Sequence, residues 1–201
     1  MTALRVIARI CVAQAIAASL LSAQPLAKRT PDQLKASYEA HKSDFDYLLG
    51  DWEFTSESQE YGKFGGRWSA VRLDTGQILD EYRVLGENSQ TLFATSTIRA
   101  FNAATDRWEL IGMTSGGGLQ DFGTARRVGS EIQIEQKFQV AEGKQIMLRI
   151  KYYNIEPSRF SWTADRSNDS GQNWIAGFQR IEARRIAPSR NLGPLTPARR
   201  P

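Results

Sequence analysis

The sequence predicts an all-β fold: a closed, antiparallel, up-and-down β-barrel of about ten strands, preceded by one short helix. From Trp52 onward, apolar and polar residues alternate with a period of two, which is typical of strands with one buried and one solvated face. Short stretches rich in Gly, Asn, Asp and Pro separate these segments, and connections this short favour antiparallel neighbours. Closure removes every strand edge, so we favour a barrel over the alternative, a two-sheet sandwich.

The segment from Glu131 to Val140 shows the alternation most clearly. Ile132, Ile134 and Phe138 share one face, and charged and amide side chains occupy the other. A membrane-spanning barrel needs an apolar outer face, so this pattern predicts an outer face in contact with water. The expected strands lie near 52–60, 64–73, 77–85, 91–101, 107–115, 119–127, 131–140, 146–155, 159–167 and 174–185.

One helix is expected before the barrel, from Thr30 to Lys42. Thr30 can cap it, Pro31 takes the first helical position, and Gln33 completes a capping-box pattern. Leu34, Tyr38 and His41 fall on one stripe at helical spacing, so the helix is expected to dock on the barrel.

Both ends of the chain read as segments outside the fold. Residues 1–23 resemble a secretory signal peptide, with Arg5 and Arg9 before an apolar run of about twelve residues, which is too short for a membrane span. We therefore expect a location in the periplasm or outside the cell. Residues 24–44 form a linker and the short helix, 45–186 the barrel, and 187–201 a disordered tail rich in Pro and Arg.

Charge and cysteine usage exclude several kinds of function. The signal and the tail hold five of the arginines, so the barrel is close to neutral although the chain carries +4, and we expect no nucleic-acid partner. The only cysteine, Cys11, lies in the signal, which excludes disulfides, thiol nucleophiles and thiolate metal sites from the mature chain. A stable insertion in the membrane is not expected, and the oligomeric state stays open.

The entry into the first strand carries a resemblance to a known fold family. The run from Phe45 to Trp52 resembles the lipocalin-type (calycin) opening, in which a short helical turn leads into Gly-x-Trp. Gly50 permits a tight entry. The resemblance implies that Trp52 closes the bottom of the barrel beneath an arginine of the last strand, where the indole and the guanidinium would gain a cation–π contact. Three arginines could fill that place: Arg180, Arg184 and Arg185.

Together with 78–84, 101–108 and 160–185, this opening is similar to a bacterial calycin group, domain-of-unknown-function family 1579. The resemblance implies a barrel, often exported, and no catalytic residues. The nitrobindin-like haem barrels are a related group that binds iron through a histidine. The single histidine here, His41, lies in the helix before the barrel, so we expect no haem, no other cofactor and no metal site.

The segment from Ser167 to Trp174 matches the Asp-box pattern Ser-x-Asp-x-Gly-x-x-Trp. Asp169 can accept bonds from turn amides, Gly171 can adopt positive φ, and Trp174 can pack beneath. A single copy predicts a rigid turn between the last two strands, with a calcium or sugar site as the alternative.

Function stays open among three hypotheses. The first is a barrel that binds a small apolar or amphipathic molecule. Its aromatic-rich interior would then be the wall of a ligand pocket, and the alternative is that these aromatic residues are the packed core of the barrel. Its candidate ligand-binding residues, taken as inward wall positions, are Tyr82, Ser96, Phe138, Tyr152 and Trp162. The second is an enzyme that uses barrel carboxylates, Asp80 or Asp165, although no catalytic residue is assigned and we expect Asp80 to pair at the mouth with Arg72 or Arg83. The third is a filled barrel that binds a protein partner.

Overall fold

The computed structural model describes residues 28–139 and 145–190. The predicted signal peptide, part of the linker, Val140 and most of the predicted tail lie outside the described residues. Within the described ranges, no helix is long and apolar enough to cross a membrane. The helical elements are α1 (Pro31–His41) and two 3-10 turns, η1 (Asp46–Leu48) and η2 (Glu87–Ser89). The strands are β1 (Gly50–Ser58), β2 (Gly62–Arg72), β3 (Ile78–Leu85), β4 (Thr91–Asn102), β5 (Arg107–Thr114), β6 (Gly118–Val128), β7 (Glu131–Gln139), β8 (Gln145–Glu156), β9 (Arg159–Ser167) and β10 (Ile175–Ala187).

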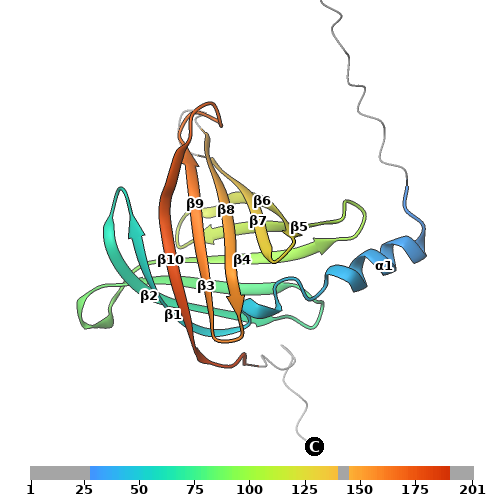
Figure 1. Ribbon diagram of the computed structural model, residues 1–201, viewed down its shortest axis with the longest axis horizontal. Coiled ribbons are helices and arrows are strands. Elements are labelled where there is room, and N and C mark those ends of the chain that lie inside the picture. The colour runs from blue at the N-terminus through green and yellow to red at the C-terminus, as the bar shows by residue number, and fades with distance from the viewer. Residues whose placement is uncertain (1–27, 140–144, 191–201) are drawn as a thin grey trace, which may run out of the picture.

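The strands form one closed antiparallel barrel, which confirms the predicted fold class. Every strand pairs with its neighbours in sequence, and β1 closes the barrel on β10. The closing ladder runs from Trp52 opposite Arg185 to Ser58 opposite Gln179. In Figure 1, β8–β10 run upright across the nearly horizontal β2–β4, and α1 projects from one side.

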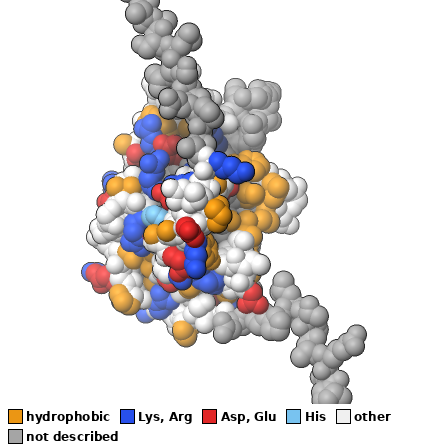
Figure 2. Space-filling model, turned by 90° about the vertical axis from the view of Figure 1, so that its right-hand side faces the viewer, with side chains coloured by type: hydrophobic (Ala, Val, Ile, Leu, Met, Phe, Trp, Pro, Cys, Tyr) orange, Lys and Arg blue, Asp and Glu red, His pale blue; other side chains and the backbone are white. Residues whose placement is uncertain are grey.

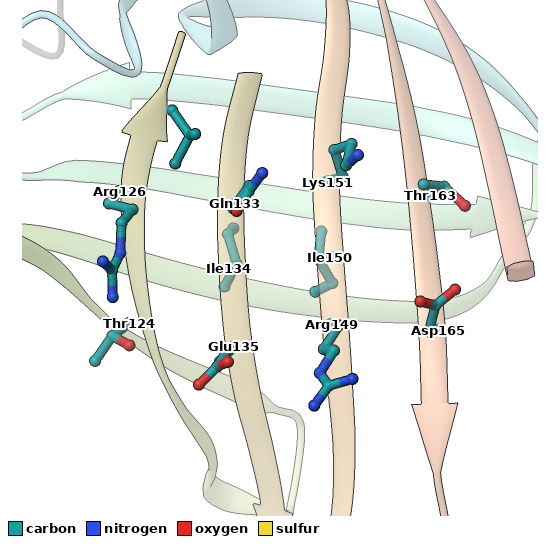
Figure 3. Close-up of a pocket in the computed structure, with 11 residues that line it drawn as sticks. Thr124, Arg126, Gln133, Ile134, Glu135, Arg149, Ile150, Lys151, Thr163 and Asp165 are labelled. Carbon is teal, nitrogen blue, oxygen red and sulfur yellow. The ribbon is translucent and has the colours of Figure 1, made fainter. Parts of the chain in front are cut away.

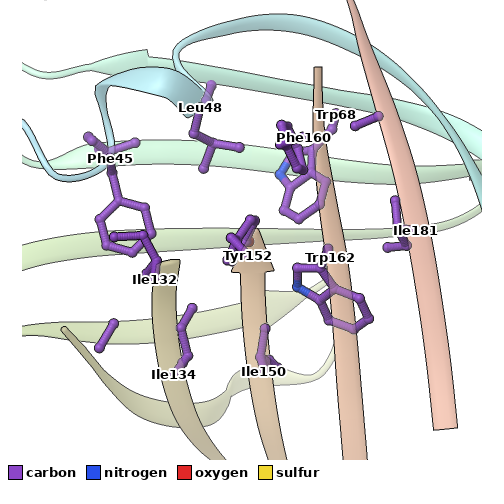
Figure 4. Packing of buried hydrophobic residues seen from close by; sticks show 14 of the residues in the cluster. Phe45, Leu48, Trp68, Ile132, Ile134, Ile150, Tyr152, Phe160, Trp162 and Ile181 are labelled. Atoms are coloured by element: carbon purple, nitrogen blue, oxygen red, sulfur yellow. The ribbon is translucent and has the colours of Figure 1, made fainter. Parts of the chain in front are cut away.

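Aromatic side chains fill the end of the barrel beside η1. Trp52 and Phe160 meet at 4.8 Å between ring centroids, and Phe45 of the entry segment contacts Trp108 edge-on at 5.1 Å. Tyr152 packs among them and is 1% exposed. Figure 4 shows this cluster between the walls of the barrel. At this end, the predicted aromatic interior is therefore a packed core.

Arg185 supplies the predicted arginine over Trp52. Its guanidinium carbon lies 4.1 Å from the centroid of the indole. The same guanidinium donates hydrogen bonds to the carbonyls of Leu49 and Tyr47 in the entry segment. Gly50 has a φ of +125°, and a Cβ there would lie 2.7 Å from the carbonyl oxygen of Ala187. Glycine is required where the chain enters the barrel, for both reasons.

The helix begins as the sequence predicts and docks outside the barrel. Thr30 accepts a hydrogen bond from the amide of Gln33, whose side chain bonds back to Thr30. Ser37 donates to Asp106 at 2.5 Å in the turn after β4. The ring of His41 stacks on Phe101 at 5.2 Å. These contacts fix α1 against the closed end of the barrel.

Candidate functional site

The two ends of the barrel differ in how they are covered. The entry segment, Arg185 and α1 cover one end, which we call the closed end. The other end, the mouth, is where β1, β3, β5 and β9 finish. The β1–β2 and β9–β10 turns mark it in Figure 1, on the side away from α1. The described turns around the mouth are 59–61, 86–90, 115–117 and 168–174.

At the mouth, side chains that face the interior are reached by solvent. Residues directly opposite each other in a ladder share a face, so the register from Trp52 and Trp68 identifies the inward positions around the barrel. Most inward residues near the closed end are buried, although Arg72 and Phe101 there are half-buried. Near the mouth, Ser56, Ser58 and Asp121 are buried, but a larger set of inward residues is half-buried. We call this half-buried set the mouth wall: Phe64, Tyr82, Thr95, Thr97, Thr114, Gln136, Phe138, Leu148 and Gln179.

Tyr82 lies where the packed core meets the mouth wall. Its ring stacks on Phe54 at 4.6 Å and meets Trp68 edge-on at 5.3 Å. Its hydroxyl is buried beside the side-chain amide of Gln179, which donates to Ser56 at 3.0 Å. Burial raises the pKa of Tyr82 more than the amide of Gln179 lowers it, so the hydroxyl is protonated at neutral pH.

Asp121 is a carboxylate on the inner wall near the mouth. It lies opposite Phe138 on one side and Gly112 on the other, and it is 4% exposed. Gln136 donates to it at 2.6 Å. Its carboxylate occupies the space in front of Gly112, where an added Cβ would lie 2.0 Å from the Oδ2 atom. Burial raises the pKa of Asp121, and the hydrogen bond from Gln136 opposes that rise.

The orientation of β6 at Asp121 is the reverse of what hydrophobicity alone would give. Phe122, the next residue, is 51% exposed on the outer face, while the carboxylate is inside. Ala125 and Ile134, directly opposite each other and both buried, fix the register further along the same ladder. The strand therefore holds a charged group inside and an aromatic ring outside, an arrangement that costs stability.

Asp80 is deeper in the barrel than expected. It is buried, forms an ion pair with the equally buried Arg99 and accepts a hydrogen bond from Trp68 Nε1 at 2.8 Å. The expected pairing at the mouth with Arg72 or Arg83 is therefore wrong. The sequence could not indicate Arg99 as the partner, because Arg99 lies near Asp80 only through the register between β3 and β4.

The five predicted ligand-binding residues fall into three places. Tyr82 and Phe138 belong to the mouth wall, while Tyr152 and Trp162 face the interior but are buried in the packed core. Ser96 lies opposite Glu81 and Met113, on the outer face, so its expected inward position is wrong. Its neighbours Thr95 and Thr97 point inward instead. A ligand-binding role for the inward four stays a prediction.

The other predicted enzyme candidate, Asp165, lies outside the barrel. It is opposite Arg149 on the outer face of β8 and β9, and it accepts the amide of Gly177 at 2.8 Å. Asp80, by contrast, is enclosed and paired. The two carboxylates are thus on opposite sides of the barrel wall and cannot act together on one substrate.

The Asp-box segment forms the β9–β10 turn. Asp169 accepts hydrogen bonds from the amides of Gln172 and Asn173 and from the side chain of Asn173. The bonds from Asn173 lower the pKa of Asp169 to about 2. Gly171 has a φ of +91°, and Trp174 Nε1 donates to its carbonyl. The carboxylate is occupied by the turn itself, as a structural role requires.

His41, the single histidine of the chain, lies at the surface beside the closed end (Figure 2). Its Nδ1 is 3.0 Å from Asp44, which is also bound by Arg127 at 2.9 Å and Trp108 at 3.4 Å. This cluster ties α1 to the barrel. Across residues 28–139 and 145–190, no group of three or more His, Cys, Asp or Glu side chains is arranged to hold a metal ion.

Two shallow depressions lie on the outer surface. The larger, about 520 Å³, covers β6–β9 and is shown in Figure 3. Charges of both signs line it, including Arg126, Glu135 and Lys151. The second, about 440 Å³, lies over β1 and β10. Sites for small apolar ligands are concave and mostly apolar. These open depressions are lined by charged side chains and therefore do not resemble such a site.

Comparisons with known proteins support the fold. No protein-family model matches the chain, and no curated protein matches it. Among solved structures, Rv2717c from M. tuberculosis is similar over 75% of this chain and 97% of its own, with a TM-score of 0.54 and 13% identity. EF1p2_mFAP2b bound to DFHBI is also similar, with a TM-score of 0.33 and 14% identity over 74% of this chain and 98% of its own. A DUF3598-family protein of unknown function from Nostoc punctiforme is similar with a TM-score of 0.23 and 10% identity over 73% of this chain and 99% of its own. The likeness to Rv2717c shows a shared barrel fold.

Proposed function

We propose that the barrel binds one small amphipathic molecule through its mouth, with the polar part of the ligand against the inner wall. The observation that carries this proposal is the graded exposure of inward-facing side chains. Among the described residues, the entry segment, Arg185 and α1 cover the closed end, whereas no comparable segment covers the mouth. A ligand could bury the half-exposed inner surface of the mouth wall.

The composition of the mouth wall fits an amphipathic ligand. Phe64, Phe138 and Leu148 offer apolar contact, and Thr97 and Gln136 offer hydrogen bonds. A mixture of apolar surface and a few polar groups is what small-molecule sites require. The hydroxyl of Tyr82 is buried beside Gln179 at the base of this wall.

Exposed apolar side chains around the rim extend the same surface outward. Phe93 is 47% exposed at the start of β4, and Tyr61, Leu92, Leu119 and Ile175 are also exposed on or beside the mouth turns. The closed end carries fewer of these, namely Val128 and Ile186. An apolar rim would lower the cost of moving an apolar group from water into the mouth.

The export signal belongs to the same proposal. With the segment before residue 24 acting as a signal peptide, the protein would meet its ligand in the periplasm or outside the cell. Membership of domain-of-unknown-function family 1579, which the sequence resembles, is likewise part of what we propose.

A dye-binding experiment tests the mouth directly. Nile red, a neutral dye, is titrated into the protein and into two variants that add the same side chain at adjacent positions. Thr95→Trp places an indole in the mouth, and Ser96→Trp, the control, places it on the outer face. We expect Thr95→Trp to weaken binding about tenfold or more, and Ser96→Trp to leave it unchanged.

Two results would contradict the proposal. One is the absence of Nile red binding to the unmodified protein. The other is loss of binding in Ser96→Trp but not in Thr95→Trp, which would place the dye on the outer surface. Thermal unfolding of both variants separates blocked binding from misfolding.

A further inference from the structure

We infer that Asp121 selects ligands that carry a protonated amine, so that the molecule bound at the mouth is a cationic amphiphile. This inference rests on the proposed function and names the chemical class of its ligand. It is carried by the position of one carboxylate on the inner wall, by the charges around it and by the reversed orientation of its strand.

Asp121 is placed to meet a ligand that enters the mouth. It faces the interior from β6, and its cross-strand partner Phe138 belongs to the half-buried mouth wall. Gly112, on the other side, has no side chain to cover the carboxylate. Gln136 holds one oxygen, Oδ1, at 2.6 Å and so fixes the orientation of the group. A ligand with a cationic head and an apolar tail could then contact Asp121 and Phe138 together.

Burial raises the pKa of Asp121 and the charge of Arg99 lowers it, but no described cation forms an ion pair with this carboxylate. Its described hydrogen-bond donors are neutral, and among residues 28–139 and 145–190 no side chain forms an ion pair with it. The two arginines that face the interior nearest the mouth are already engaged. Arg99 pairs with Asp80, and Arg166 pairs with Glu60 at 2.5 Å. Among the described residues Asp121 thus has no ion-pair partner, and a ligand cation would supply one.

The cost of this arrangement indicates that it serves a purpose other than stability. At these two neighbouring positions the buried residue is the carboxylate and the exposed one is the phenyl ring, and both placements cost stability. Positions that break local folding rules are where functional groups are expected. Burial raises the pKa of Asp121, as it does for carboxylates at binding sites.

Calorimetric titration with three probes of equal chain length tests the inference: decylamine, decanol and decanoate. We expect decylamine to bind about tenfold or more tightly than decanol, and decanoate to bind most weakly. Asp121→Asn keeps the shape of the side chain and an acceptor for Gln136. In this variant, the affinity for decylamine should fall to the affinity for decanol. Glu135→Gln, the control, removes a charge from the outer face of β7 and should leave the affinities for all three probes unchanged.

The outcomes separate this inference from the proposed function. Binding of decanol and decylamine with equal affinity, or a preference for the amine that survives in Asp121→Asn, overturns the role of Asp121 and leaves the mouth as an apolar site. A failure of every probe and of Nile red to bind overturns the proposed function, and the inference with it.

Discussion

The buried ion pair between Asp80 and Arg99 gives a quantitative test of the barrel interior. The two residues are 2% and 3% exposed. Asp80→Asn keeps the shape of the side chain and an oxygen for Trp68 Nε1, but it leaves the guanidinium as an uncompensated buried charge. Removing one partner of such a pair lowers the free energy of unfolding by about 3–5 kcal/mol.

Removing both charges should undo most of that loss. Arg99→Met replaces the guanidinium with an apolar side chain, so the double variant Asp80→Asn/Arg99→Met buries neither charge of the pair. We expect it to be about 2–4 kcal/mol more stable than Asp80→Asn alone. The control is Glu81→Gln, which removes an exposed ion pair with Arg83 on the outer face and should cost about 0–1 kcal/mol.

Urea unfolding followed by fluorescence of the five tryptophans measures these differences. The dependence of the free energy on urea should stay constant, because the surface exposed on unfolding is unchanged. For a domain of this size, the loss in Asp80→Asn corresponds to a fall in Tm of about 6–20 °C. A cost below about 1 kcal/mol for Asp80→Asn, or no recovery in the double variant, would refute the burial of this pair.

Two further predictions concern the closed end and the mouth turn. Arg185→Met removes the hydrogen bonds to the carbonyls of Tyr47 and Leu49 and the contact with Trp52, and should lower the free energy of unfolding by about 2–4 kcal/mol in the same urea assay. Equal stability of Arg185→Met and the unmodified protein would show that this cap is dispensable. The pKa of Asp169 is lowered in the fold to about 2 from 3.8, so its contribution to stability is complete above the unfolded pKa and is lost as pH falls toward 2. The stability difference between the unmodified protein and Asp169→Asn, followed by thermal unfolding, should therefore be constant at neutral pH and shrink below about pH 4; a difference that does not depend on pH contradicts this.

The barrel could be predicted from the sequence because its strands alternate strongly. Phe160, Trp162 and Ala164 sit between polar residues, so one face is assigned by hydrophobicity alone. The run around Gly50 and Trp52 could likewise be placed at the closed end, because it resembles the lipocalin-type opening. Where the two faces of a strand differ strongly in hydrophobicity, the alternation of residues shows which face points inward.

The mouth could not be predicted to the same degree, because its residues lack that contrast. In β4, Thr95, Ser96 and Thr97 are all small and polar, so nothing in their chemistry says which of them points inward. At Asp121, the alternation favours the wrong face. The partnership of Asp80 with Arg99 depends on how two strands align, and alignment is set by the closed barrel rather than by either strand.

The closure of β1 on β10 also constrains how the protein can be made. Arg185 and Leu49, which lie in contact, are 136 residues apart in sequence. The final seam cannot form until nearly the whole chain is available, and fold formation that depends on such distant contacts is slow. Until then, β1 and the most recently emerged strand present unpaired backbone, which can recruit other chains. Chains shortened before β10 should therefore accumulate as aggregates rather than as smaller barrels.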